Sequence, residues 1–426
     1  MKGVIAKMQQ KKLAIIGAGA SGMAAAIEAA REARNCNEDI KITLYEKLPK
    51  VGKKILATGN GRCNILNCGS FDGKFNGNKK LVDTVFENYP VGSNIRFFES
   101  MGIIMTEESD GRLYPMSLQA SAVLDALRFE LDNLGIEVIC DCPISKISKA
   151  NNRFILNDSY QADAVIVAGG GKSSPVQGSD GSCLTLLGAL GIKINPVHPA
   201  LTGIVLKKKN KSLKGVRAHG EILIVDNGKV VASDVGEIQY TDYGISGIPT
   251  MNVSRFVSEH FTYGKKGKIY ACLNVLPEFT PDEIYSYILS RKKSNPELHC
   301  EDILSGIIPK KLAVAKLQAA DIDINKKAGN LTKNEISALT EILNSEISEI
   351  TGTPGFENSQ VTAGGAASNC FNAETLEATK IKGLFACGEI IDADGACGGY
   401  NLTWAWSSGR CTGSAAVKYL TETDNA

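Results

Sequence analysis

The sequence lacks the features that mark membrane, secreted, metal-binding and nucleic-acid-binding proteins. No hydrophobic run in its 426 residues approaches the length of about 18 that a membrane span needs, and residues 1–11 lack the apolar centre of a signal peptide, so we expect a cytoplasmic protein. The formal net charge is only +1, so we expect neither nucleic acid nor a membrane as a partner. There are four histidines, and none of the 12 cysteines stands in a C-x-x-C pair, so we expect no metal site.

A glycine-rich segment near the N-terminus predicts a dinucleotide-binding unit. The apolar run 13–16 is typical of a buried strand, the GAGASG segment 17–22 follows, and small residues continue as a helix. In this pattern Gly17 makes the tight turn, Gly19 admits a pyrophosphate, and Gly22 allows helix and strand to pack closely. The helix N-terminus adds N–H groups and a partial positive charge that favour phosphate.

A second predicted strand, residues 42–46, ends in Glu46, at the place where such a unit carries an acidic residue for the adenosine ribose. The spacing from Gly17 exceeds the usual ~20 residues. We expect the helix to run on through the polar residues 31–39, which would account for the excess. An ordinary strand, turn and helix without a ligand is the alternative interpretation.

The order of the predicted strands and helices indicates an α/β protein interrupted by an insertion. Strand and helix patterns alternate over 1–195 and again over 350–426, whereas 196–349 contains short strand patterns followed by helices at about 275–345. We expect strands at 204–206, 221–225, 229–232 and 268–273, and helices at 281–293 and 333–344, both opened by a capping box.

The C-terminal part carries a second glycine-rich segment. The short apolar strand 382–389 ends in Gly388 and Glu389, and the turn 395–401 precedes a predicted helix over 402–419. Flavoproteins of the glutathione-reductase type place a late Gly-Asp or Gly-Glu strand end beside the flavin, and this segment resembles that element. A helix N-terminus there would stabilise negative charge on a reduced flavin.

Eight segments together resemble the BaiN/RdsA (YhiN-like) family of NAD(P)/FAD-dependent oxidoreductases. They are GAGASGMAAA, GKKILATGNGRCNILN, DGRLYPMSLQAS, DAVIVAGGG, HPALTGI, GEIQYTDYGISGIP, VTAGG and GLFACGEIIDADGACGGYNLTWAWSSG. The resemblance implies a discontinuous Rossmann-like FAD-binding domain of the glutathione-reductase type with an inserted β-barrel plus helical domain. It implies non-covalent FAD as the cofactor.

The resemblance also implies which residues contact the cofactor. It places the pyrophosphate at the first glycine motif, the ribityl phosphate at the Gly-Glu strand end, and the isoalloxazine ring at the last glycine turn. The expected contacts are Gly17, Gly19, Ala20, Ser21, Gly22, Glu46, Lys47, Gly61, Arg62, Cys63, Asn64, Ile144, Ala168, Gly169, Gly388, Glu389, Asp392, Gly399, Tyr400, Asn401 and Leu402.

The resemblance implies an NAD(P)H-linked reductase of an activated C=C bond in a small, enone-like or steroid-like molecule. No second GxGxxG is present, so NADH or NADPH would serve only as a transient electron donor. An amine or amino-acid oxidase and an RNA-associated flavoprotein are the alternatives. As proton donors we consider Asp242, Tyr243 and Tyr400, each of which also suits a purely structural role.

Overall fold

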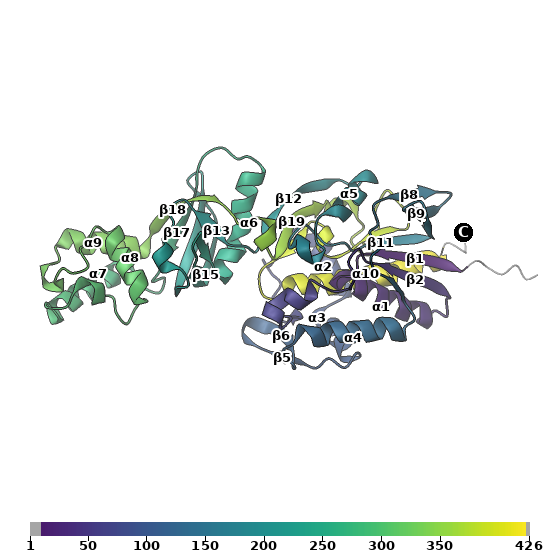
Figure 1. The fold of residues 1–426 in the computed structure, drawn as a ribbon, viewed down its shortest axis with the longest axis horizontal. Helices are drawn as coiled ribbons and strands as arrows, with labels where there is room; N and C mark the ends of the chain where they lie inside the picture. Colours follow the sequence, from purple (N-terminus) through teal and green to yellow (C-terminus); the bar gives the residue numbers. More distant parts are fainter. Residues whose placement is uncertain (1–9, 423–426) are drawn as a thin grey trace, which may run out of the picture. The chain divides into compact units, whose positions relative to one another are not determined.

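The structure is a computed structural model that describes residues 10–422 (Figure 1). The chain divides into two compact units, each described here by itself. Unit 1 contains the residues up to Val197 and those from Val361 onward, and unit 2 is His198–Gln360. The expected boundary between 349 and 350 falls inside a strand, β18 (Glu346–Gly352). Residues 1–9 and 423–426 of the expected outer segments lie outside the described residues.

Unit 1 is built on a parallel sheet in the order β20-β11-β1-β2-β7. Its central strand β1 (Lys11–Ile16) lies between β2 (Ile40–Tyr45) and β11 (Ala164–Val167). The edge strands are β7 (Glu137–Ile139) and β20 (Leu384–Ala386), so the C-terminal segment completes the N-terminal sheet. This arrangement confirms the predicted α/β class.

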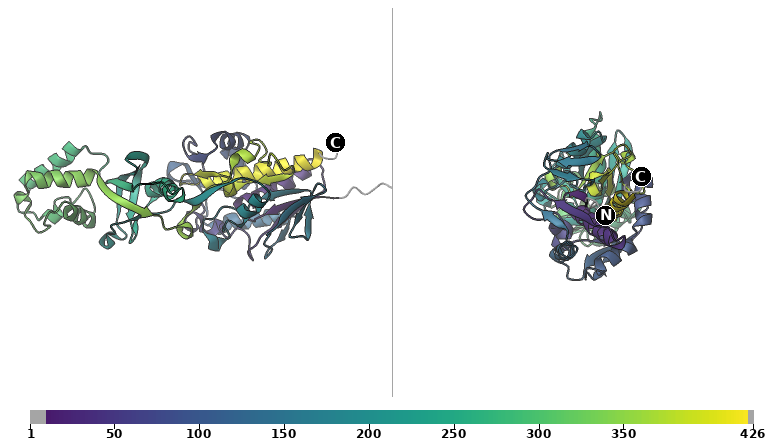
Figure 2. Two further views of the ribbon diagram at one scale, coloured as in Figure 1. Left: turned by 90° about the horizontal axis from the view of Figure 1, so that it is seen from above. Right: turned by 90° about the vertical axis from the view of Figure 1, so that its right-hand side faces the viewer.

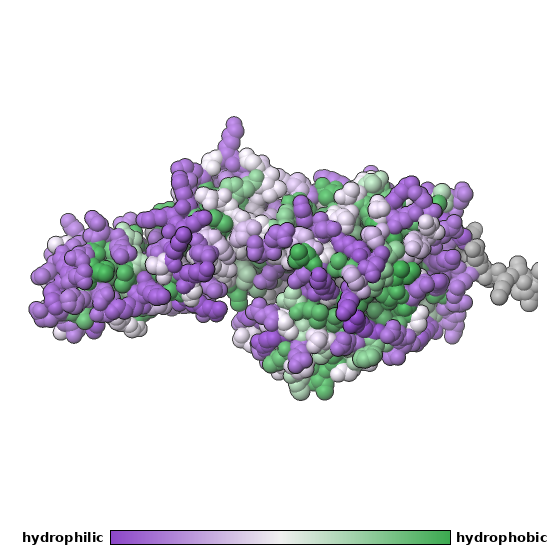
Figure 3. All heavy atoms as spheres, viewed as in Figure 1, coloured by the Kyte–Doolittle hydropathy of each residue, from purple (hydrophilic) through white to green (hydrophobic). Residues whose placement is uncertain are grey.

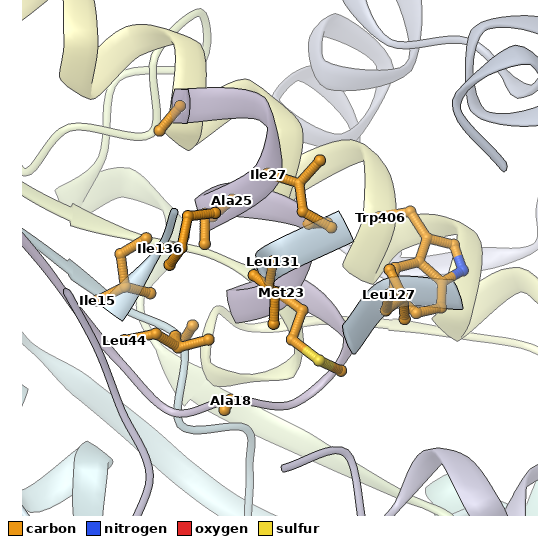
Figure 4. Close-up of a cluster of buried hydrophobic side chains, with 14 of the residues drawn as sticks. Ile15, Ala18, Met23, Ala25, Ile27, Leu44, Leu127, Leu131, Ile136 and Trp406 are labelled. Atoms are coloured by element: carbon orange, nitrogen blue, oxygen red, sulfur yellow. The ribbon is translucent and has the colours of Figure 1, made fainter. Parts of the chain in front are cut away.

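Three helices pack near this sheet. α1 (Ala20–Asn35) contacts α10 (Tyr400–Glu422), a single helix of 23 residues, along much of its length, and also contacts α4 (Ala120–Asn133) (Figures 1 and 2). Apolar side chains from one face of the sheet and from these helices, including Ile15 and Trp406, form a buried cluster (Figure 4). α1 ends at Asn35 instead of running through residue 39, but it still separates Glu46 from the glycine motif.

Unit 1 also contains shorter strands and helices that are not part of this sheet. They are β3 (Leu66–Asn67), β4 (Phe75–Gly77), α2 (Lys79–Asn88), α3 (Val91–Glu99), β5 (Met105–Glu107), β6 (Arg112–Pro115), β8 (Ile147–Ala150), β9 (Arg153–Leu156), β10 (Tyr160–Ala162), α5 (Ser182–Ala189), β19 (Val361–Ala366) and β21 (Ala393–Gly395). β12 (Ile194–Ala200) runs across the boundary into unit 2.

Unit 2 contains a closed antiparallel barrel in the order β13-β16-β15-β14-β17-β18. Its strands are β13 (Ile204–Leu206), β14 (Arg217–Asp226), β15 (Lys229–Tyr240), β16 (Gly244–Ser246), β17 (Ile269–Asn274) and β18. Alternate side chains such as Ile222 and Ile224 are buried in its core together with Val253 and Val257 of α6 (Ile248–Thr262). β15 extends well beyond the predicted 229–232, because it pairs with β14 as a long hairpin.

Helices α7 (Pro281–Ser294), α8 (Lys310–Ala319) and α9 (Lys333–Asn344) lie between β17 and β18 in the sequence. Capping boxes open α7 at Thr280 and α9 at Thr332, where the predicted helix bounds are confirmed closely. In the view of Figure 3 the surface over these helices is mostly hydrophilic. Within residues 10–422, no helix has the length and apolar character needed to cross a bilayer.

Candidate functional site

The first glycine motif forms the tight turn between β1 and α1. The Gly17 N–H donates to the carbonyl of Tyr45 at 2.8 Å, which fixes the turn on the neighbouring strand. A Cβ on Gly22 would lie 1.8 Å from the Gly17 carbonyl oxygen, so only glycine fits where helix and turn meet. The motif therefore has the close backbone packing that its sequence predicts.

The N-terminus of α1 is open. Gly19 is the N-cap, and a Cβ added to it would meet no heavy atom of the described residues within 4 Å. The first turn has no acidic residue, and Gly19 contributes no side-chain cap. The first N–H groups of a helix, here including those of Ala20 and Ser21, have no intrahelical acceptor, and the space beside Gly19 admits an anionic group.

Glu46 follows β2 and is buried, with 8% of its surface exposed. One carboxylate oxygen accepts the Ala18 N–H at 2.9 Å, and the other accepts the Leu48 N–H at 2.9 Å. Since a carboxylate oxygen carries two lone pairs, each oxygen keeps one for a further donor such as a ribose hydroxyl. Glu46 therefore shapes the turn after β1 as well as offering an acceptor.

Lys47 pairs with Asp180 at 2.7 Å. Burial alone would raise the pKa of Asp180, but the hydrogen bonds from Lys47 and Ser182 outweigh it and lower the pKa to about 2. Lys47 thus forms an ion pair with a neighbouring carboxylate, and no sequence motif indicates Asp180 as its partner.

The remaining expected contacts on this side lie at or near the carboxyl ends of the sheet strands. The Ala168 N–H donates to the Ile16 carbonyl at 2.8 Å, and Gly169 packs against Cys183. Ile144 lies in the loop after β7, with its side chain buried. Ligands of open parallel sheets bind at this edge, so these positions are consistent with the expected contacts.

Gly388 of the second motif lies against Ser21 of the first. A Cβ on Gly388 would come within 2.4 Å of the Ser21 hydroxyl oxygen, and its φ of +77° also favours glycine. The Gly388 N–H donates to Ser408 Oγ at 2.9 Å, and its carbonyl accepts the Trp404 indole N–H at 3.1 Å. Residues from opposite ends of the chain are therefore joined at one place.

Glu389 connects three segments of unit 1. One oxygen accepts the Thr362 backbone N–H at 2.9 Å, and the other accepts Lys54 Nζ at 2.9 Å. The Thr362 hydroxyl oxygen accepts the N–H groups of Lys172 and Ser173 at 2.7 and 2.9 Å. Sequence reasoning missed Thr362, although it lies in the VTAGG segment that was used for the resemblance.

Asp392 lies between the Gly-Glu strand end and the last glycine turn. Its carboxylate accepts the side-chain N–H of Asn195 at 2.7 Å, and its backbone N–H donates to the Ala366 carbonyl at 2.9 Å. Asp392 is thus held in place by two neighbouring segments of unit 1.

The loop 55–64 contains left-handed residues at Gly59, Asn60, Gly61 and Cys63. Burial raises the pKa of the Cys63 thiol to about 11, so Cys63 is protonated at neutral pH and is a poor nucleophile. Arg62 makes an ion pair with Glu108, and its guanidinium lies 4.4 Å from the centroid of the Tyr114 ring.

Asn64 ends this loop and faces the last glycine turn. A Cβ on Gly399 would lie 2.7 Å from Asn64 Oδ1. This amide oxygen is buried, and no hydrogen-bond partner for it is found among the described residues. Because buried acceptors are nearly always satisfied, Asn64 is placed to accept a hydrogen bond from a bound ligand.

The turn before α10 is held by its own side chains. Asn401 exchanges hydrogen bonds with the backbone N–H and carbonyl of Gly395, both at 2.8 Å. The Tyr400 hydroxyl donates to the Ser70 carbonyl at 3.2 Å, and burial raises the pKa of Tyr400. Leu402 packs against the buried apolar cluster that contains Ile15 and Trp406.

Asp242 and Tyr243 lie in unit 2, whereas Tyr400 lies in unit 1. Asp242 is exposed and pairs with Lys214 at 2.7 Å, and the hydrogen bond from Lys214 lowers the pKa of Asp242. Asp242 is therefore a carboxylate at neutral pH, which weighs against its role as a proton donor. The Tyr243 ring packs over Gly203. Among residues 10–422, no group of three metal-ligating side chains is present.

Comparison with known proteins places the chain in a family. The family model described as the HI0933-like protein Rossmann domain matches residues 11–415. The chain is 35% identical over 412 residues to a 3-dehydro-bile acid delta(4,6)-reductase from Clostridium scindens, covering 96% of this chain and 99% of that protein. It is 25% identical over 402 residues to a ribosomal RNA dihydrouridine synthase from Haemophilus influenzae, covering 92% and 95% of the two chains.

Among solved structures, the Escherichia coli quinol fumarate reductase resembles this chain with a TM-score of 0.48 and 18% identity, covering 98% of this chain and 71% of that one. The family model and the first relative both span nearly the whole chain, which confirms the resemblance drawn from the sequence motifs. The chain therefore belongs to the HI0933-like Rossmann family.

Proposed function

We propose that the protein is an FAD-dependent reductase of carbon–carbon double bonds that are conjugated with a carbonyl group. The observation that carries this proposal is the 35% identity to the bile acid reductase over nearly the full length of both chains. The glycine-rich turns of unit 1 support this proposal, and bound FAD, once reduced, would supply the hydride.

Two features of unit 1 fit FAD. The open space at Gly19 and the uncapped first turn of α1 suit a pyrophosphate, because N–H groups at a helix N-terminus bind anions. The orphaned Asn64 Oδ1 beside Gly399 suits an N–H donor of a flavin ring. Glu46 would accept from the adenosine ribose, and Gly388, Glu389 and Asp392 would line the ribityl phosphate. The remaining residues that the resemblance implies as cofactor contacts would also contact FAD.

The names of the two relatives describe one kind of chemistry. The delta(4) bond of a 3-dehydro steroid is conjugated with the 3-oxo group, and a delta(6) bond is conjugated with that group through delta(4); dihydrouridine is uridine reduced at a double bond conjugated with the C4 carbonyl. In both cases hydride adds at the far carbon, and negative charge passes to the carbonyl oxygen. We therefore infer an activated C=C as the reacting group, with a steroid-like enone as the first candidate substrate.

Uridine in ribosomal RNA is the second candidate. Relatives named ribosomal RNA dihydrouridine synthase cover more than nine tenths of this chain, so the net charge of +1 does not exclude an RNA substrate. In unit 2, exposed lysines follow β13 at 207–209, 211 and 214. Nothing in the comparisons favours an amine or amino-acid oxidase.

The electron donor and the proton donor complete the proposal. We propose NADH or NADPH as the electron donor. Its binding would be transient, because the sequence has only one GxGxxG motif. Tyr400 and Tyr243 are retained as proton-donor candidates. Tyr400 would first have to release its hydrogen bond to Ser70.

An anaerobic titration tests the proposed function. The purified yellow protein would be titrated with NADH and with NADPH, and then given a 3-oxo-delta(4) steroid, 2-cyclohexenone, or a uridine-containing ribosomal RNA fragment. We expect either NADH or NADPH to bleach the flavin absorbance and an enone to restore it. Recovery with the RNA fragment alone would establish the second candidate, and recovery only in air would contradict both.

A further inference from the structure

A hairpin of unit 1 brings a guanidinium to the last glycine turn. β3 and β6 pair antiparallel with Asn67 opposite Arg112. The Asn67 side-chain N–H donates to the Gly398 carbonyl at 2.8 Å. A Cβ on Gly398 would lie 3.7 Å from Asn67 Nδ2 and 3.9 Å from Arg112 Nε. The turn that precedes α10 is thus flanked by a positive charge that neither the glycine motif nor α10 supplies.

The Arg112 guanidinium uses only one of its N–H groups in a hydrogen bond to another described residue. Its Nη2 atom donates to Asp110 Oδ2 at 2.6 Å, and no second hydrogen-bond acceptor for this guanidinium is found among the described residues. The Arg112 side chain is 24% exposed and that of Asp110 is 74% exposed. Such an exposed pair adds little to folding stability, but it orients the guanidinium. Four of its five N–H donors remain available.

From this position we infer that Arg112 binds the carbonyl oxygen of the substrate and stabilises the enolate that forms there. The inference rests on the proposed function and identifies the residue that recognises the oxygen. A hydride, which bound reduced FAD would supply and by whose loss it would be reoxidised, forms the new C–H bond at the β-carbon, and the C=C electron pair shifts to leave negative charge on the carbonyl oxygen. A proton, from one of the two tyrosine candidates or from solvent, then adds to the α-carbon, and the carbonyl is restored.

Arginine suits this role because it stays protonated throughout and forms strong, paired hydrogen bonds with an oxyanion. The other polar groups near the turn are less suited. The Tyr400 hydroxyl donates to the Ser70 carbonyl, and Asp110 carries a negative charge that would repel an enolate. Removal of one donor from an oxyanion site commonly slows a reaction by about 10²–10³.

The test uses R112M, which removes the charge at similar length, and R112K, which keeps the charge but lacks the paired N–H donors of a guanidinium. R128M is the matched control, since Arg128 lies on α4 and pairs with exposed Asp125 at 3.8 Å. The first readout is the apparent pKa of 4-nitrophenol bound to the FAD-loaded protein, because a phenolate resembles an enolate. The second is the rate at which dithionite-reduced protein is reoxidised by an enone. Flavin content and reduction potential are measured for every variant.

We expect wild type and R128M to lower the pKa of bound 4-nitrophenol, R112M to abolish that shift, and R112K to keep part of it. Enone reoxidation should fall about 100-fold or more in R112M at unchanged flavin content. A wild-type protein that does not bind 4-nitrophenol, or an R112M variant with an unchanged shift, overturns the inference. A changed reduction potential with an unchanged shift also overturns it and assigns Arg112 to the cofactor. If the shift depends on Arg112 but no enone reoxidises the protein, the oxyanion site stands and the proposed function fails.

Discussion

Ser21 and Gly388, from opposite ends of the chain, lie in direct contact, and a Cβ on Gly388 would come within 2.4 Å of Ser21 Oγ. Ser21 stands in the first turn of α1, and Gly388 follows the edge strand β20. The contact joins the two glycine-rich segments on which the proposed cofactor site depends. Its integrity can be tested separately from catalysis.

Replacement of Gly388 by alanine should destabilise unit 1 and reduce flavin retention. The new methyl group would overlap Ser21, and the left-handed backbone at φ +77° adds a cost of roughly 1–2 kcal/mol. Urea unfolding and flavin content per protein measure the two effects. Gly135→Ala is the matched control, since Gly135 has φ +70° and a Cβ there meets no described atom within 4 Å. Equal losses in both variants would show that the contact with Ser21 has no effect.

Replacement of Gly19 by valine should abolish flavin retention without unfolding the protein. The side chain would project into open space, so the apo protein should keep its stability, but that space is where the pyrophosphate is proposed to bind. Flavin content after purification and reconstitution with added FAD provides the measurement. A Gly19→Val protein as yellow as wild type would contradict the assignment.

Replacement of Thr332 by alanine should weaken unit 2 without affecting the flavin. The Thr332 hydroxyl accepts the Glu335 N–H at 3.2 Å, and Glu335 in turn accepts the Thr332 N–H at 2.7 Å. Loss of an N-cap costs about 1 kcal/mol. Urea unfolding should register this loss while the visible spectrum stays unchanged. A changed spectrum would mean that unit 2 and the flavin site are coupled.

The pair of Lys47 and Asp180 should make stability depend on acid. Because the folded-state pKa of Asp180 lies at about 2, below its ordinary value of 3.8, its stabilising effect is complete above pH 3.8 and is lost as the pH falls toward 2. The difference in unfolding free energy between wild type and Asp180→Asn should therefore shrink over that range. Asp72→Asn is the control, since Asp72 is 92% exposed and lies 3.9 Å from Lys79. A difference that is constant with pH would refute the assignment.

Local patterns predicted most of the fold. The GAGASG segment specified its own turn because Gly22 must pack directly against the Gly17 carbonyl, and Thr332 and Glu335 marked the start of α9 through an equally local contact. The bounds of β15 were underestimated because its length depends on pairing with β14.

The site was less predictable because its contacts join distant segments. The bonds from Lys54 and Thr362 to Glu389, the orphaned oxygen of Asn64, and the approach of Arg112 to Gly398 all depend on the assembled unit 1. The segments that carry these residues were recognisable, but no spacing within any one of them indicates its partner.

A single-turnover experiment tests whether reduced flavin in this protein reduces an enone. Protein loaded with FAD and reduced anaerobically with dithionite would be mixed with one equivalent of a 3-oxo-delta(4) steroid, and the oxidised flavin and the product would be quantified together. We expect oxidised flavin to return in proportion to a saturated ketone heavier by two hydrogens. A flavin that stays reduced with this steroid and with simple enones, yet is oxidised at once by air, would contradict it.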